Sequence, residues 1–203
     1  AIWISGILGE NQLSANQIAL NLASMTFMVA NGLGITAMIR VGNQLGARNY
    51  ANLRRVAFSV FLLVLCTQAF FAGLLAILRD WLPSLYLEMD NVEKAATNAA
   101  VISEAANLLL IAAIFQISDG LQVTALGALR GMQDAKVPMV ITFIAYWLIA
   151  FPILCALGLN TSLGTMGIWI GLLTGLTAAA ICLLYRFNHI SLRLIANRHK
   201  LPN

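Results

Sequence analysis

The chain alternates between long apolar stretches and short polar connections. The apolar stretches occupy about residues 14–39, 54–78, 101–129, 137–157 and 165–187. Each is long enough for a helix that crosses a bilayer, which needs roughly 20 residues. Residues 1–9 resemble the last turns of one further helix that began before Ala1. The pattern predicts an all-α polytopic membrane bundle, with five complete transmembrane helices and the end of a sixth.

The predicted domain organisation is simple. Residues 1–188 form the helical domain, and residues 189–203 form a polar tail that is either solvated or a short amphipathic helix. Of all residues 60% are hydrophobic and only 10% are charged, whereas soluble domains carry roughly 25% charged residues. The three cysteines lie far apart within apolar stretches, without the spacing of a disulfide framework or a zinc site. Composition therefore excludes a soluble domain and places the chain in the lipid bilayer.

The positive charges indicate the orientation of the helices. If the five stretches cross the membrane one after another, ten of the 12 Lys and Arg residues fall on one side. Only Arg79 and Lys94 fall on the other. The side rich in Lys and Arg is normally cytoplasmic, so the C-terminus is expected in the cytoplasm. Topology thus accounts for the net charge of +4, and we expect no nucleic-acid partner.

One of the eight acidic residues, Asp119, is left in the middle of a predicted span, whereas Glu104 lies near the non-cytoplasmic end of the same span. A carboxylate at the centre of a membrane helix costs about 2.5–3.5 kcal/mol on insertion scales. Phe115, Asp119 and Gln122 follow one another at intervals of four and three residues, so they share one helix face. No Lys, Arg or His lies within an apolar core to pair with this acid. Either protonation or a bound cation would neutralise it, which is the behaviour that ion-coupled transport requires.

A second polar stripe follows the first complete span. Gln17, Asn21, Ser24, Met28 and Asn31 recur at intervals of three and four residues, which places them on one helix face. Amide side chains that face lipid would lack hydrogen-bond partners. The stripe therefore either lines a water-filled cavity or forms hydrogen bonds between helices, and the sequence leaves both open.

Glycine and proline mark further features of the spans. Several glycines are four residues apart, as Gly127 and Gly131 are, and this spacing permits close approach of two helices. Pro152 lies in the middle of the fourth complete span. Because proline lacks an N–H group, it is expected to kink this helix and to free a carbonyl group.

Three parts of the chain resemble transporters of the multidrug and toxic compound extrusion (MATE) family, and most closely its bacterial NorM-type branch. Residues 17–49, which include IRVGNQLGA, resemble the eighth helix and the following loop of that family, and residues 108–138 resemble the tenth helix. The segments ITFIAYW and GIWIGLLTGLTAAA are similar to the last two helices. The resemblance implies twelve helices in two six-helix lobes, of which this chain is the second. The first lobe, on the N-terminal side, is then its partner.

The family resemblance also implies an activity: alternating-access antiport, in which inward flow of H+ or Na+ drives export of cationic amphiphilic compounds across the bacterial inner membrane. Asp119 occupies the position implicated in binding the coupling cation, and would hold Na+ if the protein is sodium-coupled. Phe115 stands where the family often has a tyrosine, which removes one oxygen donor. No cofactor beyond the ion is expected. The candidate cavity-lining residues are Phe115, Gln122, Gln17, Asn21, Asn31 and Tyr146.

Two alternatives remain at this point. A lipid-linked saccharide flippase of the same superfamily usually needs a cationic cavity, and the helix cores contain no Lys or Arg. An integral-membrane enzyme usually needs a histidine cluster or a motif such as HExxH. Both histidines, His189 and His199, lie in the tail. We therefore expect a transporter and not an enzyme.

Overall fold

The computed structural model describes residues 10–87, 95–161 and 163–198, and all the long elements among them are helices. In chain order the elements are α2 (Glu10–Gly46), α3 (Tyr50–Ile77), the short 3-10 helix η1 (Leu82–Tyr86), α4 (Ala95–Gly131), α5 (Lys136–Ile144), the π-helical turn η3 (Ala145–Ala150), α6 (Phe151–Leu159) and α7 (Thr165–Arg198). Counting α5, η3 and α6 as one span, five helices are long and apolar enough to cross a membrane. The predicted polytopic bundle is confirmed, while the helix expected at residues 1–9 lies outside the described residues.

The helices are longer than the apolar stretches that predicted them. Helix α2 has 37 residues, and α4 also has 37. Helix α7 continues without a break to Arg198, so residues 189–198 extend the last helix. The domain boundary at residue 188 stays a prediction. The helices are longer because helical hydrogen bonds do not require an apolar sequence, and polar turns extend the helix beyond the hydrocarbon layer.

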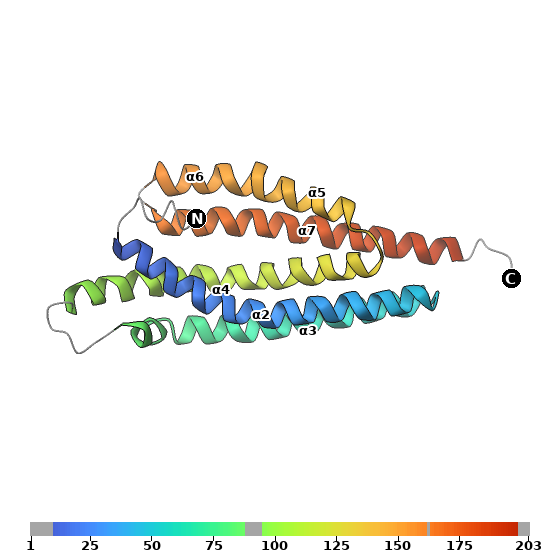
Figure 1. Ribbon diagram of the computed structural model, residues 1–203, viewed down its shortest axis with the longest axis horizontal. Helices are drawn as coiled ribbons and strands as arrows, with labels where there is room; N and C mark the ends of the chain where they lie inside the picture. The colour runs from blue at the N-terminus through green and yellow to red at the C-terminus, as the bar shows by residue number, and fades with distance from the viewer. Residues whose placement is uncertain (1–9, 88–94, 162, 199–203) are drawn as a thin grey trace.

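Helix α4 lies at the centre of the bundle, between α7 on one side and the pair α2 and α3 on the other (Figure 1). The α2–α4 contact brings two backbones together. A Cβ atom on Gly127 would overlap the carbonyl oxygen of Gly34, and one on Gly131 would overlap that of Met38. The close approach predicted from glycine spacing is therefore present where α2 crosses α4.

The polar connections of one end of the bundle contact each other. The guanidinium of Arg186 in α7 donates two hydrogen bonds to Asp134 in the α4–α5 connection, at 2.6 and 3.1 Å. Arg54 at the start of α3 donates a 3.3 Å hydrogen bond from Nη1 to the hydroxyl of Ser191 in α7. These contacts join the end of α4, the start of α3 and the last turns of α7 at one end of the bundle, as alternating crossings require (Figure 1).

Buried apolar residues gather in two clusters along the bundle. One cluster includes Ala19, Leu108 and Trp169, and the other includes Val41, Leu129 and Phe187. Along α2, α3 and α4, most of the buried polar side chains lie between the residues of one cluster and those of the other. They are Thr26, Gln68, Gln116, Gln122 and Thr124. The middle of the bundle therefore holds most of the buried polar side chains of the described residues, beside buried apolar ones such as Val64 and Leu176.

Candidate functional site

Asp119 lies in the middle of α4 and lines a small cavity of about 130 Å³. Three helices contribute to its wall: α2, α4 and α7. The lining residues are Leu20, Ala23, Ser24, Phe27, Phe115, Asp119, Trp169 and Leu172. The carboxyl group thus lies in a mostly apolar cavity. Along α4, this position falls between the two clusters of buried apolar residues.

The Asp119 side chain has no hydrogen bond and no ion pair to any residue that the structure describes. Nor do three or more His, Cys, Asp or Glu side chains cluster anywhere in the described part of the chain. Asp119 is half-buried, and a carboxylate that is removed from water is costly unless it is protonated or paired with a cation.

One wall of the cavity is fixed by Trp169 of α7. Its indole is 2% exposed, and its Nε1–H donates a 2.9 Å hydrogen bond to Oδ1 of Asn16 in α2. The ring of Phe115 meets the indole edge-on, with ring centroids 5.4 Å apart. Phe115 therefore packs against a wall that is itself tied to a second helix.

A second contact joins α4 to α7 beside the cavity. The hydroxyl groups of Ser118 and Thr177 lie 3.0 Å apart, and either can donate the hydrogen bond. Because Ser118 immediately precedes Asp119, this bond holds α4 against α7 at the level of the carboxyl group.

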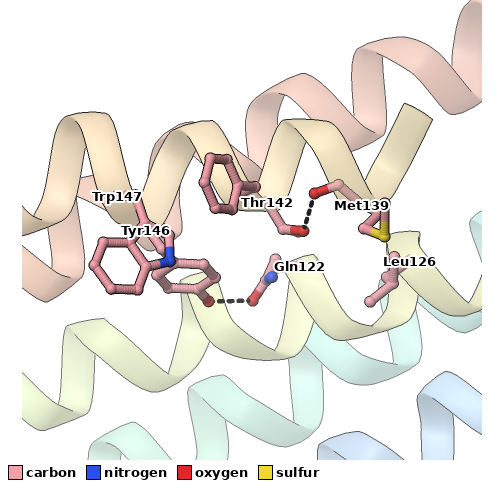
Figure 2. A pocket seen from close by; sticks show the side chains of 7 residues that line it. Gln122, Leu126, Met139, Thr142, Tyr146 and Trp147 are labelled. Carbon is pink, nitrogen blue, oxygen red and sulfur yellow. Dashed lines mark hydrogen bonds between the residues drawn. The ribbon is translucent and has the colours of Figure 1, made fainter. Parts of the chain in front are cut away.

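A larger groove of about 390 Å³ lies beside the same stretch of α4. It is lined by Gln122 and Leu126 of α4 and by Met139, Thr142, Phe143, Tyr146 and Trp147 of α5 and η3. The phenol of Tyr146 donates a 3.0 Å hydrogen bond to Oε1 of Gln122 across the groove (Figure 2). Gln122 and Tyr146, two predicted cavity residues, thus meet although they are far apart in sequence.

A π-helical turn shapes the part of the wall that carries Tyr146. At the end of this turn the N–H of Phe151 donates to the carbonyl of Tyr146, five residues earlier. Pro152 follows at the start of α6. The sequence predicted a disturbance at this proline, and the structure has a widened turn just before it. Such turns are frequent at functional sites in helical proteins.

The polar stripe of α2 lies largely outside these two cavities. Gln17, Asn21 and Asn31 are all exposed on the surface of the described bundle, and none of them lines either cavity. Ser24 does line the Asp119 cavity, and its hydroxyl donates to the carbonyl of Leu20 in its own helix at 2.7 Å. Whether the three amides line a cavity stays a prediction.

Sequence reasoning missed several residues of the site. Trp169, Leu20 and Phe27 line the Asp119 cavity, but they have the same apolar character as packing residues. The only available signal was helical spacing: Leu20 and Phe27 are seven residues apart, so they lie on the same side of α2 as Ser24.

Comparison with known proteins shows the family. The model of the family described as MatE matches residues 1–155. The multidrug resistance protein NorM of Burkholderia vietnamiensis is 39% identical over 191 residues, which are 94% of this chain and 40% of that protein. The multidrug resistance protein PmpM of Pseudomonas aeruginosa is 38% identical over 205 residues, 99% of this chain and 41% of that protein. The chain thus spans about two fifths of the length of these relatives.

Solved structures share the fold. The eukaryotic MATE transporter AtDTX14 superimposes with a TM-score of 0.80 at 20% identity, covering 95% of this chain and 43% of that one. An outward-facing multidrug resistance MATE transporter gives a TM-score of 0.79 at 16% identity, covering 93% and 40%. The names of these proteins are those of transporters and resistance proteins, in agreement with the expectation that the chain is not an enzyme. The chain belongs to the MatE family.

Proposed function

We propose that the chain is the second lobe of a twelve-helix antiporter that exports cationic amphiphilic compounds by alternating access, driven by H+ or Na+. The observation that carries the proposal is Asp119, a carboxyl group inside a membrane-spanning helix that lines a cavity without a partner among the described residues. The similarity to multidrug resistance proteins supports the class of substrate.

The coupling ion acts at Asp119 in this mechanism. Protonation or Na+ binding removes the net charge from the middle of α4 and changes the hydrogen bonds that its carboxyl group can form. If the two states of the carboxyl group favour different arrangements of the lobes, ion binding shifts the population between them. A cationic substrate competes for the same acidic region, which couples its release to ion entry.

Both ions are compatible with the side chains around Asp119. Sodium prefers several oxygen ligands, and Phe115 supplies none where the family often has a phenol. Among the described residues that line the Asp119 cavity, Ser24 is the only other one with an oxygen atom in its side chain. This set favours a proton or a sodium site with less exacting geometry.

The partner in the proposal is the N-terminal six-helix lobe of the same transporter. The exposed amides of Gln17, Asn21 and Asn31 on α2 support this arrangement. On a surface that faces lipid they would lack hydrogen-bond partners. Facing a water-filled cleft between two lobes, they would be hydrated.

We further propose that the protein resides in the bacterial inner membrane with its C-terminus in the cytoplasm. The end of the bundle that carries Arg54, Asp134 and Arg186 is then the cytoplasmic end. The excess of Lys and Arg in the connections at this end supports the orientation.

The test is efflux of a fluorescent cationic dye from bacterial cells that express the intact transporter, compared with its Asp119→Asn variant, with and without external sodium. Glu104→Gln is the matched control, because Glu104 is an acid of the same helix that lines neither cavity. We expect efflux to be lost in Asp119→Asn and retained in Glu104→Gln. Dependence of wild-type efflux on sodium identifies Na+ as the coupling ion, and independence identifies H+.

Two results would contradict the proposal. Unimpaired efflux by Asp119→Asn would mean that ion coupling takes place in the first lobe. If the wild-type protein reached the membrane and exported no cationic dye, the antiporter proposal would be wrong, and lipid-linked saccharide transport would become the better hypothesis.

A further inference from the structure

Two glutamine side chains are buried in the bundle without a hydrogen bond to any residue that the structure describes. Gln68 of α3 is 1% exposed and Gln116 of α4 is 2% exposed. In both, the amide nitrogen and the amide oxygen lack a partner. A glutamine amide has two donors and one acceptor oxygen with two lone pairs. Within the hydrocarbon layer, lipid supplies no partner for these groups, and leaving them unpaired costs several kcal/mol each.

Gly120 places the Gln68 amide against α4, one turn from Gln116. The Cγ and Nε2 atoms of Gln68 lie 2.7 and 3.1 Å from the position that a Cβ atom of Gly120 would take. Gln116 precedes Gly120 by one turn on the same face of α4, and such residues have Cβ atoms roughly 5–6 Å apart. Together these two distances place the Gln68 Nε2 atom no more than about 9 Å from the Cβ atom of Gln116. The missing Cβ of Gly120 makes the room that the Gln68 side chain fills.

Two described groups close to Gly120 supply no partner for the amides. The hydroxyl of Thr124 already donates to the carbonyl of Gly120, at 2.8 Å. Val64, one turn before Gln68 on α3, places a methyl group 3.2 Å from the same Gly120 position. Asp119 faces a different cavity, whose lining includes neither glutamine.

We propose that Gln68 and Gln116 form a buried water-binding site between α3 and α4, next to Gly120. A buried water molecule typically makes about three hydrogen bonds to polar groups that lack other partners. The two amides together offer donors and acceptors in that number. A neutral hydrogen-bonding ligand fits better than a cation, because neither amide carries a charge. This site is independent of the coupling ion at Asp119.

The experiment is water-edited solid-state NMR of the intact transporter in lipid bilayers, with 15N in the glutamine side chains and the tryptophan indoles. Signals are assigned by comparison with Gln68→Leu and Gln116→Leu. The indole of Trp169 is the matched control, since it is equally buried but bonded to Asn16. We expect water magnetisation to reach both amides rapidly and the Trp169 indole slowly. In Gln68→Leu, transfer to Gln116 should fall towards the rate of the indole.

Three outcomes would overturn the water site. The first is transfer to both amides as slow as transfer to Trp169. The second is a direct amide-to-amide contact between the two glutamines, which would show that they bond to each other. The third is a shift of both signals when sodium replaces potassium, which would identify a cation site. Gly120→Ala provides a variant that keeps both amides, and it should displace the Gln68 side chain and slow transfer to it.

Discussion

The two faces of α4 meet their surroundings in different ways. The face towards α2 and α3 carries glycines, and Gly127 and Gly131 bring the helix backbones into direct contact. The face with Phe115, Asp119 and Gln122 instead borders two cavities, whose other walls come from α2 and α7 and from α5 and η3. Where α2 crosses it at Gly127 and Gly131, the first face leaves no space for an additional atom, whereas the second keeps open space around an unpaired carboxyl group.

Because the two faces are packed differently, we expect one to determine mainly stability and the other mainly transport activity. Substitutions on the packed face must move a backbone or a buried side chain, so they change the free energy of unfolding. Substitutions on the cavity face remove groups that have few protein partners, so they change transport more than stability. This comparison can be tested by measuring unfolding for variants of each face.

The largest effect is expected for Gly127→Ala. The added methyl group would overlap the carbonyl oxygen of Gly34, and both are attached to backbone that cannot rotate away. Overpacking of a core typically costs 1–3 kcal/mol and occasionally more, and we expect at least about 3 kcal/mol here. Thermal unfolding of the purified protein measures the loss. Gly73→Ala is the control, since nothing lies within 4 Å of its Cβ position; equal stability of the two variants would contradict the close α2–α4 packing.

A smaller loss is expected for Trp169→Phe. The substitution keeps an aromatic ring in the wall of the cavity but leaves Oδ1 of Asn16 without its donor. An unsatisfied buried polar group costs about 1–3 kcal/mol, which should lower the unfolding temperature. Trp147→Phe is the matched control, because Trp147 is 60% exposed. If both variants unfolded at the same temperature, the Asn16–Trp169 bond would not hold α2 to α7.

Tyr146→Phe tests the hydrogen bond across the larger groove. Removing the hydroxyl deletes the bond to Gln122, and hydrogen bonds between membrane helices average about 0.6 kcal/mol. We expect a decrease of that size in the free energy of unfolding. Tyr185→Phe serves for comparison, because Tyr185 is 73% exposed. A decrease above about 2 kcal/mol would exceed the largest values measured for hydrogen bonds between membrane helices. Tyr146 would then contribute to stability as the residues of the packed face do.

The smallest change in stability is expected for Asp119→Asn. No described residue pairs with the carboxyl group, so its replacement by a neutral group of the same shape removes no contact. We expect the free energy of unfolding to change by less than about 0.5 kcal/mol, although efflux is lost. A destabilisation of several kcal/mol would show instead that Asp119 has a structural partner and would remove the contrast between the faces.

Much of the fold was predictable because the bilayer imposes a simple rule. A helix must be apolar over the hydrocarbon thickness, so the five spans follow from hydrophobicity alone. The ends of the helices did not follow from it. Helix α7 continues to Arg198 because backbone hydrogen bonding persists outside the apolar layer. The turn before Pro152 was foreseen as a disturbance, but its π-helical form depends on how α5 and α6 pack on α7.

The candidate site was predictable only in part. Asp119 is conspicuous because a charge within an apolar span is costly, and this cost depends on composition and not on neighbours. Trp169 and Leu20 carried no such signal, since apolar residues are expected throughout a span. Gln68 and Gln116 were equally hidden, because a single glutamine in an apolar stretch does not reveal whether it meets protein, lipid or water.

The sequence by itself determined that the chain crosses the membrane, which segments form its helices, and that Asp119 lies in the middle of one of them. Each of these results depends on the transfer free energy of the residues of one span, without reference to the other spans. Only the tertiary structure decided that Tyr146 bonds to Gln122, that Trp169 closes the cavity of Asp119, and that Gln68 reaches Gly120. These contacts join different helices, and the rotation and crossing of helices are set by the packing of side chains, which no single span specifies.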